Sequence, residues 1–378
     1  MGRIYFRWLI VNPWELTMRK AVVFGLMLVA LAGLARADEA CGEGRMQDGG
    51  CIKEDSFAIG PGINLAFVTR WKAADVITFV TIDVLESAQL VQTLEMPDMS
   101  APMLELSAQD ANFDGFSDLM LLAAAGATGN TSYMLWLFDP ETRRFVAFPR
   151  FLDLSSPSFD PVNKQINTHN KGGHAGLLYV DMSYKWNGLS IYKVAEERQD
   201  EMKMPGYFYN VRYKGKGLIE SEKIVRVSDD GAETVVYGPT SPPATCGPVI
   251  AVIDFTAAEL QRDVEAMMTF YAPLVVWQGA PKSPEALKAM HEKWLSSLVE
   301  YKLSVDNFRV ALSEDGQTSL VVADVTGIYT DQSGKGHQFK TAKQFRLSLV
   351  DGKWKIGCEE VSAFLDGTRA KTSNECRL

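Results

Sequence analysis

The residues best suited to do chemistry form one short acidic loop. It reads Asp110-Ala111-Asn112-Phe113-Asp114-Gly115-Phe116-Ser117-Asp118. Oxygen-bearing side chains occupy the first, third, fifth and ninth positions, a glycine at the sixth permits a sharp turn, and the seventh offers a backbone carbonyl. A hard cation takes about 6–8 oxygen ligands at ~2.3–2.6 Å. The spacing therefore predicts calcium as a cofactor, with Asp110, Asn112, Asp114, Phe116 and Asp118 as its ligands.

Two features limit what this loop is expected to do. Leu121 stands where a helix–loop–helix calcium site has its bidentate glutamate, so we do not expect a helix–loop–helix site. One alternative is an acidic turn without any ion. Another is an ion that only stabilises the loop. We favour this over a catalytic or sensing ion, because no nucleophile or second acidic cluster accompanies the loop.

Catalytic residues are harder to find. The best candidates for a buried acid or base are Tyr271, Asp324, Tyr329 and His337. Asp324 alternates with apolar neighbours, which is typical of an outward-facing strand residue, and His337 follows a glycine-rich turn. No G-x-S-x-G, H-E-x-x-H or phosphate-binding loop is present. We therefore predict a binding protein rather than an enzyme, and leave the activity of the C-terminal half open.

The N-terminal residues predict export. Met18-Arg19-Lys20 precedes an apolar run over residues 21–34, and Ala35-Arg36-Ala37 follows. This order is typical of a secretory signal at 18–37 that is cleaved after Ala37. The run is shorter than the ~20 residues of a membrane-spanning helix. We expect a periplasmic protein without a stable membrane anchor.

Charge and cysteines agree with an exported protein. The net charge of −9, with no dense basic patch, argues against nucleic acid as a partner. In an oxidising compartment cysteines pair by default. We expect Cys41 with Cys51, closing a short glycine-rich loop, and Cys358 with Cys376, fixing the C-terminal tail. This leaves Cys246 over, and other pairings stay open on sequence grounds.

The elements that must position these residues change character along the chain. Residues 52–198 predict short strands, for example at 76–80, 133–138 and 188–192, with frequent turns. The proline-rich stretch near 239–243 predicts a linker. Beyond it, Thr256 to Glu259 resembles a capping box, with a helical apolar pattern from Leu260 to Tyr271. A second helix is expected from Ser283-Pro284, then four strands near 302–313, 318–330, 337–350 and 353–363.

These patterns predict an α+β protein overall. Its N-terminal domain would be mainly β with a calcium-binding loop, and its C-terminal domain an α+β cone with a curved antiparallel sheet. The expected bounds are a signal peptide at 18–37, a β-rich calcium-loop domain at 38–238, a Pro-rich linker at 239–254, a cone-like domain at 255–366 and a C-terminal tail at 367–378.

The N-terminal half resembles a known family over residues 75–195. The acidic loop, its apolar exit Leu119-Met120-Leu121-Leu122, and later Gly172-Gly173-His174-Ala175-Gly176 and Tyr184-Lys185-Trp186-Asn187-Gly188 carry the resemblance. It is similar to periplasmic proteins with one FG-GAP-like calcium loop, related to lysozyme inhibitors and immunity proteins. The resemblance implies a small β domain that occludes the cleft of a peptidoglycan hydrolase or lysozyme-like protein with a protruding loop.

Two glycine-rich segments, 126–133 and 169–176, are candidates for that loop. Their polar residues that could reach catalytic carboxylates are Asn130, Tyr133, His169, Asn170 and His174. The alternative is that both are ordinary hairpin loops.

The C-terminal half resembles the nuclear-transport-factor-2-like, or ketosteroid-isomerase-like, cone over residues 255–365. Two helices, four strands and the closing Asp351-Gly352-Lys353-Trp354-Lys355-Ile356 carry the resemblance. The cone hosts enzymes as well as non-catalytic binding modules.

The favoured function is an exported immunity protein or lysozyme inhibitor, and two alternatives use the cone. One is a protein that binds a small molecule or envelope component, and the other is an isomerase or hydratase. A binder needs an apolar cavity near Trp277 or Trp294. An enzyme needs a titratable group inside that cavity.

Overall fold

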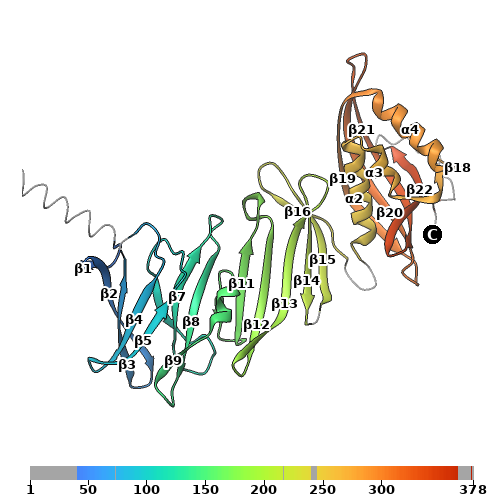
Figure 1. The fold of residues 1–378 in the computed structure, drawn as a ribbon. Coiled ribbons are helices and arrows are strands. Elements are labelled where there is room, and N and C mark those ends of the chain that lie inside the picture. The colour runs from blue at the N-terminus through green and yellow to red at the C-terminus, as the bar shows by residue number, and fades with distance from the viewer. Residues whose placement is uncertain (1–40, 73, 216, 240–244, 365–375, 377–378) are drawn as a thin grey trace, which may run out of the picture. The chain divides into compact units, whose positions relative to one another are not determined.

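The computed structural model describes residues 41–72, 74–215, 217–239, 245–364 and 376. The predicted signal peptide and nearly all of the predicted C-terminal tail lie outside these residues. Strands hold 58% and helices 13% of the described part. The predicted α+β class is therefore wrong: the protein is mostly β, with several antiparallel sheets (Figure 1). The prediction overestimated the helical share of the chain, because it relied on clear helical patterns near 256–271 and 284–298, which are short segments.

The chain divides into two compact units. The first runs to Asn170 and includes Lys185–Ile191, and the second holds Lys171–Tyr184 and the chain from Tyr192. The strands up to the boundary are β1 (Arg45–Gln47), β2 (Gly50–Gly60), β3 (Ile63–Trp71), β4 (Val80–Glu86), β5 (Gln89–Met96), β6 (Leu106–Gln109), β7 (Asp118–Ala125), β8 (Thr131–Asp139), β9 (Arg144–Ala147), β10 (Ser158–Asp160) and β11 (Gln165–Lys171). A 3-10 helix, η1 (Pro149–Asp153), follows β9.

Two antiparallel sheets, in the orders β1-β2-β3-β4-β5 and β6-β7-β8-β9, form the first unit together with the pair β10-β11. Strand β4 buries every second residue, as expected for one face against a core. Strand β7 is buried almost throughout, which explains its continuous apolar run. The acidic loop connects β6 to β7. The strand predicted at 76–80 is wrong, since only Val80 belongs to β4 and Ile77 forms an isolated bridge with Ala101.

The second unit contains the described α-helices. After η2 (His174–Gly176), its elements are β12 (Tyr179–Asn187) and β13 (Ser190–Glu201), which cross the boundary, then β14 (Tyr207–Lys214), β15 (Leu218–Val227), β16 (Glu233–Tyr237), α2 (Gly247–Leu260), α3 (Val264–Met268), β17 (Tyr271–Trp277), β18 (Ala280–Lys282), α4 (Pro284–Ser296), β19 (Leu298–Leu312), β20 (Thr318–Asp331), β21 (Gly336–Val350) and β22 (Lys353–Phe364). The last sheet has the order β18-β17-β22-β21-β20-β19.

The first predicted helix differs most from the structure. Helix α2 begins at Gly247, inside the predicted linker, so Thr256 is a buried helical residue whose hydroxyl donates to the Val252 carbonyl rather than a cap. The pattern from Leu260 to Tyr271 does not form one helix. Arg262 has a φ of 57°, which interrupts the helix, and the Asp263 side chain then caps α3. The second helix and the four strands after it are confirmed within a few residues.

A β-bulge in β22 determines which of its residues face inward. Ile356 stands opposite Leu347, and Glu359 stands opposite Phe345. Residues 356 and 359 are an odd number apart, so a regular strand would place them on opposite faces. The register shift between Arg346 and Leu347 adds one residue to β22, and both side chains turn inward. The bulge thereby places a carboxylate on the apolar face of the sheet.

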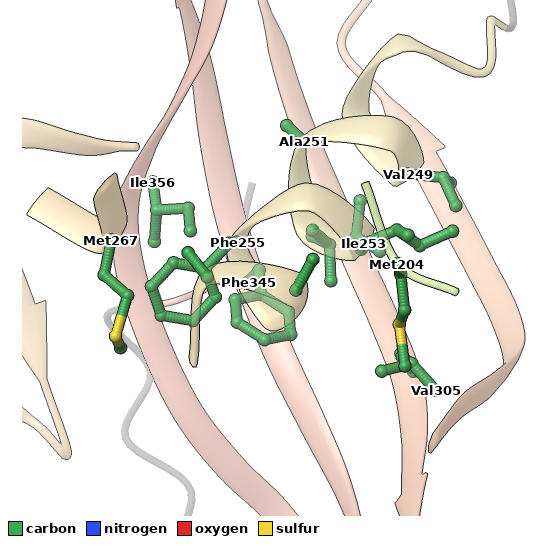
Figure 2. Packing of buried hydrophobic residues seen from close by; sticks show 14 of the residues in the cluster. Met204, Val249, Ala251, Ile253, Phe255, Met267, Val305, Phe345 and Ile356 are labelled. Carbon is green, nitrogen blue, oxygen red and sulfur yellow. The ribbon is translucent and has the colours of Figure 1, made fainter. Parts of the chain in front are cut away.

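The core of the second unit lies between α2 and the six-stranded sheet (Figure 2). Phe255 of α2 meets Phe345 of β21 edge-to-face, with ring centroids 6.3 Å apart. Met204 and Tyr207, from before the predicted linker, belong to the same core, and the Tyr207 hydroxyl donates to the Val305 carbonyl.

Two disulfides join Cys41 to Cys51 and Cys358 to Cys376, the two pairs expected from the sequence. Such pairs are typical of exported proteins. Cys246 is buried and not in a disulfide. None of the helices in the described part is long and apolar enough to cross a bilayer.

A buried polar cluster in the C-terminal pocket

A cavity of about 320 Å³ opens between α4 and the inner face of the six-stranded sheet, and we call it the C-terminal pocket. Its lining residues are Glu259, Trp277, Gln278, Met290, His291, Trp294, Lys343 and Glu359. The two tryptophans and the methionine provide apolar walls. The charged residues are largely buried: Glu259 and Glu359 are 3% and 1% exposed, and the Lys343 side chain 18%. An apolar cavity with a few converging polar groups is typical of a small-molecule site.

Each polar residue of this cluster comes from a different element. Glu259 lies in the last turn of α2, while Tyr271 opens β17. His291 occupies the buried stripe of α4, four residues after Leu287 and four before Leu295. Lys343 shares the inner face of β21 with buried alternate residues such as Phe345.

One part of the cluster is a hydrogen-bonded chain through Tyr271. Its hydroxyl lies 2.7 Å from Glu359 Oε2, to which it donates, and 3.1 Å from His291 Nε2. A phenol has a single proton to donate. His291 must therefore donate its Nε2 proton to the Tyr271 oxygen, which defines its neutral tautomer.

The other part centres on Lys343, whose ammonium group lies between two carboxylates. Its Nζ is 3.4 Å from Glu359 Oε1 and 3.8 Å from Glu259 Oε2. The other oxygen of Glu259 accepts a 2.6 Å hydrogen bond from the Tyr301 hydroxyl of β19. Both buried carboxylates thus have hydrogen-bond donors, as buried charges require.

Burial dominates the protonation of these groups. It raises the pKa of Glu359, against the opposing effect of Lys343, and lowers the pKa of His291, which favours the neutral imidazole. Burial, with the Glu359 charge, raises the pKa of Tyr271 well above its ordinary range. Burial opposes the charge on Lys343, but Glu259 and Glu359 outweigh it, so its pKa is raised.

Three of the four catalytic candidates from the sequence lie outside the cluster. Asp324 accepts hydrogen bonds from Asn307 and Arg309. Tyr329 stacks on His337, with ring centroids 4.7 Å apart, beside a different and shallower cavity. Only Tyr271 belongs to the pocket.

Sequence reasoning missed most of the cluster. Glu259 was interpreted as a capping residue, and Lys343 and Glu359 were not singled out. His291 carried a readable signal, because a histidine on the apolar stripe of a helix is a buried polar group that needs a partner. The signal for Glu359 was weaker: the extra residue of the bulge is Gly357, and an isolated glycine within a strand pattern can indicate a bulge.

The acidic loop in the first unit is folded by its own amides. Asp110 accepts from the amides of Asp114 and Gly115, and Asp114 accepts from that of Phe116. The Asn112 side chain accepts from the Asp114 amide and donates to the Asp114 carboxylate.

Asp118, the loop's ninth residue, is fully buried. Its carboxylate accepts from the amides of Ala111, Asn112 and Phe138. Burial raises its pKa to about 7, partly offset by these amides.

The loop geometry bears directly on the predicted calcium site. Two oxygens bound to one calcium ion lie at most about 5 Å apart. In the described part of the chain, the carboxylate oxygens of Asp110, Asp114 and Asp118 do not all lie within 4.8 Å of one another. These three carboxylates therefore do not converge on one ion in this arrangement. Calcium binding stays a prediction.

The five predicted partner-binding residues are divided between the two units, and their role stays a prediction. In the first unit, the Asn130 side chain donates to that of Asn170, and the His169 amide donates to the Ser155 carbonyl. The Tyr133 hydroxyl donates to Glu105. In the second unit, His174 pairs with Glu201 at 3.0 Å.

The first unit also holds a larger cavity, of about 760 Å³, beside the Cys41–Cys51 disulfide. Lys53, one of its charged lining residues, pairs with Glu43 and Asp55. Among its described lining residues, none forms a buried hydrogen-bonded chain like that of Tyr271 and Glu359. The smaller C-terminal pocket is therefore the better candidate site.

Comparisons with known proteins give little further information. No protein-family model and no curated protein matches this chain. Solved structures do show likenesses. A ketosteroid isomerase-like protein from Erwinia carotovora is 13% identical, with 32% of this chain and 95% of that chain covered and a TM-score of 0.28. An NTF2-like protein from Pseudomonas putida is 18% identical, with 30% and 81% covered and a TM-score of 0.26.

A calcium/calmodulin dependent protein kinase II association domain from Xanthomonas campestris is 20% identical, with 36% of this chain and 95% of that chain covered and a TM-score of 0.28. TM-scores in this range are too low to support a conclusion about fold or activity.

Proposed function

We propose that this protein binds a small organic molecule in the C-terminal pocket. The observation that carries the proposal is the combination of apolar walls from Trp277, Met290 and Trp294 with a buried polar cluster at Glu259 and Glu359. An apolar ligand body would displace water from the walls, while a polar end would meet the cluster. Burying charges costs free energy, so a buried charged cluster that lines a cavity points to a role in recognition or chemistry.

Binding fits the cluster better than turnover does. The Tyr271 proton is held by Glu359, and the Lys343 ammonium is shared by two carboxylates. A general base needs a lone pair directed at substrate, and a general acid needs a proton free to leave. Here the titratable groups are engaged with one another, so we do not propose a reaction.

The test uses three probes that share one ring system: naphthylmethanol, naphthylmethylamine and naphthoate. Each is titrated into the purified protein by calorimetry. We expect at least one to bind at micromolar to millimolar concentration, the range of fragment-sized ligands in apolar pockets. Met290→Trp should abolish this binding, because the indole would fill the cavity.

The matched control is Ala289→Trp, which adds the same side chain at the adjacent, exposed position of α4. Both variants are first compared with the parent by circular dichroism. If none of the probes binds, or if Met290→Trp binds them as well as Ala289→Trp does, the pocket is not the binding site.

A further inference from the structure

We infer that the C-terminal pocket selects a cationic ligand, a small organic amine whose ammonium group lies against Glu259 while its apolar body lies against the two indoles. This inference rests on the proposed function and specifies the chemical class of its ligand.

The first argument is the charge balance of the cluster. Two buried carboxylates, Glu259 and Glu359, face one ammonium group, that of Lys343. The remaining polar members, Tyr271, Tyr301 and His291, are neutral donors or acceptors. With both carboxylates ionised, the described groups of the cluster therefore carry one net negative charge. In a cavity with low dielectric response, that charge attracts a cation far more strongly than it would in water.

The second argument locates this charge at Glu259. Glu359 is held by the closer contact with Lys343, at 3.4 Å, and by the 2.7 Å hydrogen bond from Tyr271. Glu259 has a donor at Tyr301 for one oxygen only, and its other oxygen is 3.8 Å from Lys343 Nζ, beyond hydrogen-bond distance. A ligand ammonium could complete the hydrogen bonding of that second oxygen, since Glu259 lines the pocket.

The third argument is the nature of the walls. Trp277 is half-buried and Trp294 is 36% exposed, and both line the same cavity as Glu259. The face of an indole attracts cations more strongly than any other side-chain ring. Met290 adds a polarisable sulfur to this lining. The indoles and the sulfur would therefore attract a cation that enters the cavity before it reaches the Glu259 carboxylate.

An anionic ligand fits the same geometry poorly. Lys343, the one cation among the described lining residues, already lies between two carboxylates. Any anion approaching its Nζ would also face Glu259 and Glu359 at short range. Repulsion of this kind excludes unwanted ligands as effectively as attraction selects the wanted ones.

The experiment compares the affinities of the three naphthalene probes at pH 7. We expect naphthylmethylamine, which is an ammonium ion at this pH, to bind at least about tenfold more tightly than naphthylmethanol, with naphthoate the weakest. Glu259→Gln keeps an acceptor for Tyr301 but removes the charge. It should lower the affinity for the amine to about that for the alcohol, and so remove the preference for the cation.

The matched control is Glu265→Gln, which removes the same charge from an exposed position on the neighbouring α3 and should change neither affinity. If the alcohol binds as tightly as the amine, or if Glu259→Gln keeps the preference, the inference is wrong while the proposed binding function stands. If Glu259→Gln does not fold, the comparison of amine with alcohol in the parent protein decides by itself. Absence of binding by all three probes would instead overturn the proposed function.

Discussion

Asp118 illustrates how one buried carboxylate organises a loop that the sequence presents as a metal site. Its two oxygens accept from the amides of Ala111, Asn112 and Phe138, and thereby connect the loop to β8. The same residue type at the ninth position would serve an ion or these amides, and sequence spacing alone does not distinguish the two uses. The aspartate at the fifth position, Asp114, makes only exposed contacts within the loop.

This difference predicts unequal effects of two similar substitutions. Asp118→Ala leaves the amides of Ala111 and Phe138 buried without acceptors, at a cost of about 1–3 kcal/mol each. We expect the free energy of unfolding, measured by urea denaturation with chelator present, to fall by several kcal/mol. Asp114→Ala, the matched control, should change it by less than about 1 kcal/mol. An equal fall in the free energy of unfolding for the two variants would mean that Asp118 does not stabilise the protein through its hydrogen bonds to the buried amides.

At the scale of elements, the strands of the second unit were largely predictable and the inner faces were not. Alternating residues and turn glycines located β19 to β22 within a few residues, because pattern and turn chemistry agree there. The hairpin of β17 and β18 was missed, since its first residue, Tyr271, continues a helical apolar pattern. The pocket depends on the bulge opposite Arg346 and Leu347, for which Gly357 is the one local signal, and a glycine alone does not say which side chains turn inward.

Gly327 of β20 lies where an added side chain would be crowded. A Cβ there would lie 2.5 Å from the Phe339 ring and 2.9 Å from the Lys302 carbonyl oxygen. A backbone atom cannot move aside as a side chain can, so Gly327→Ala should overpack this part of the sheet. We expect it to lower the free energy of unfolding by about 1–3 kcal/mol, measured by the urea midpoint.

The control for this substitution is Gly336→Ala in β21, where a Cβ would meet nothing within 4 Å. Its free energy of unfolding should stay within about 0.5 kcal/mol of the parent. A tolerated alanine at residue 327 would show that the sheet relaxes at this point, and that its curvature does not depend on the glycine.

At the scale of the whole molecule, the positions of the cysteines predicted both disulfides, but the local patterns predicted a wrong fold class. Short helices with clear caps, such as α4 after Ser283, are more visible in a sequence than long strands, although strands account for most of the described residues. The domain predicted as a cone also shares its core with Met204 and Tyr207, which precede the predicted linker. Long-range packing of this kind cannot be read from local patterns.

The lysozyme-inhibitor function stays a prediction at this scale. It relies on two glycine-rich segments, which include Asn130 and Asn170. The Asn130 side chain donates a hydrogen bond to that of Asn170, and this contact orients both side chains in the first unit. The acidic net charge would steer the protein to a basic hydrolase, so inhibition should weaken as salt rises. We expect stoichiometric inhibition of at least one member of a panel of purified lysozymes, with Asn130→Ala and Asn170→Ala each reducing it.

Calcium binding by the acidic loop can be tested by thermal stability and by the same inhibition assay. If an ion stabilises the acidic loop, added calcium should raise the melting temperature, and chelator should reverse this shift. Loss of inhibition with chelator would connect the loop to the inhibitory surface, whereas unchanged inhibition would separate them. If the folded protein inhibits none of the lysozymes, the inhibitor prediction is wrong. The C-terminal pocket, which lies wholly in the second unit, would be unaffected by that result because its ligand binding is measured independently.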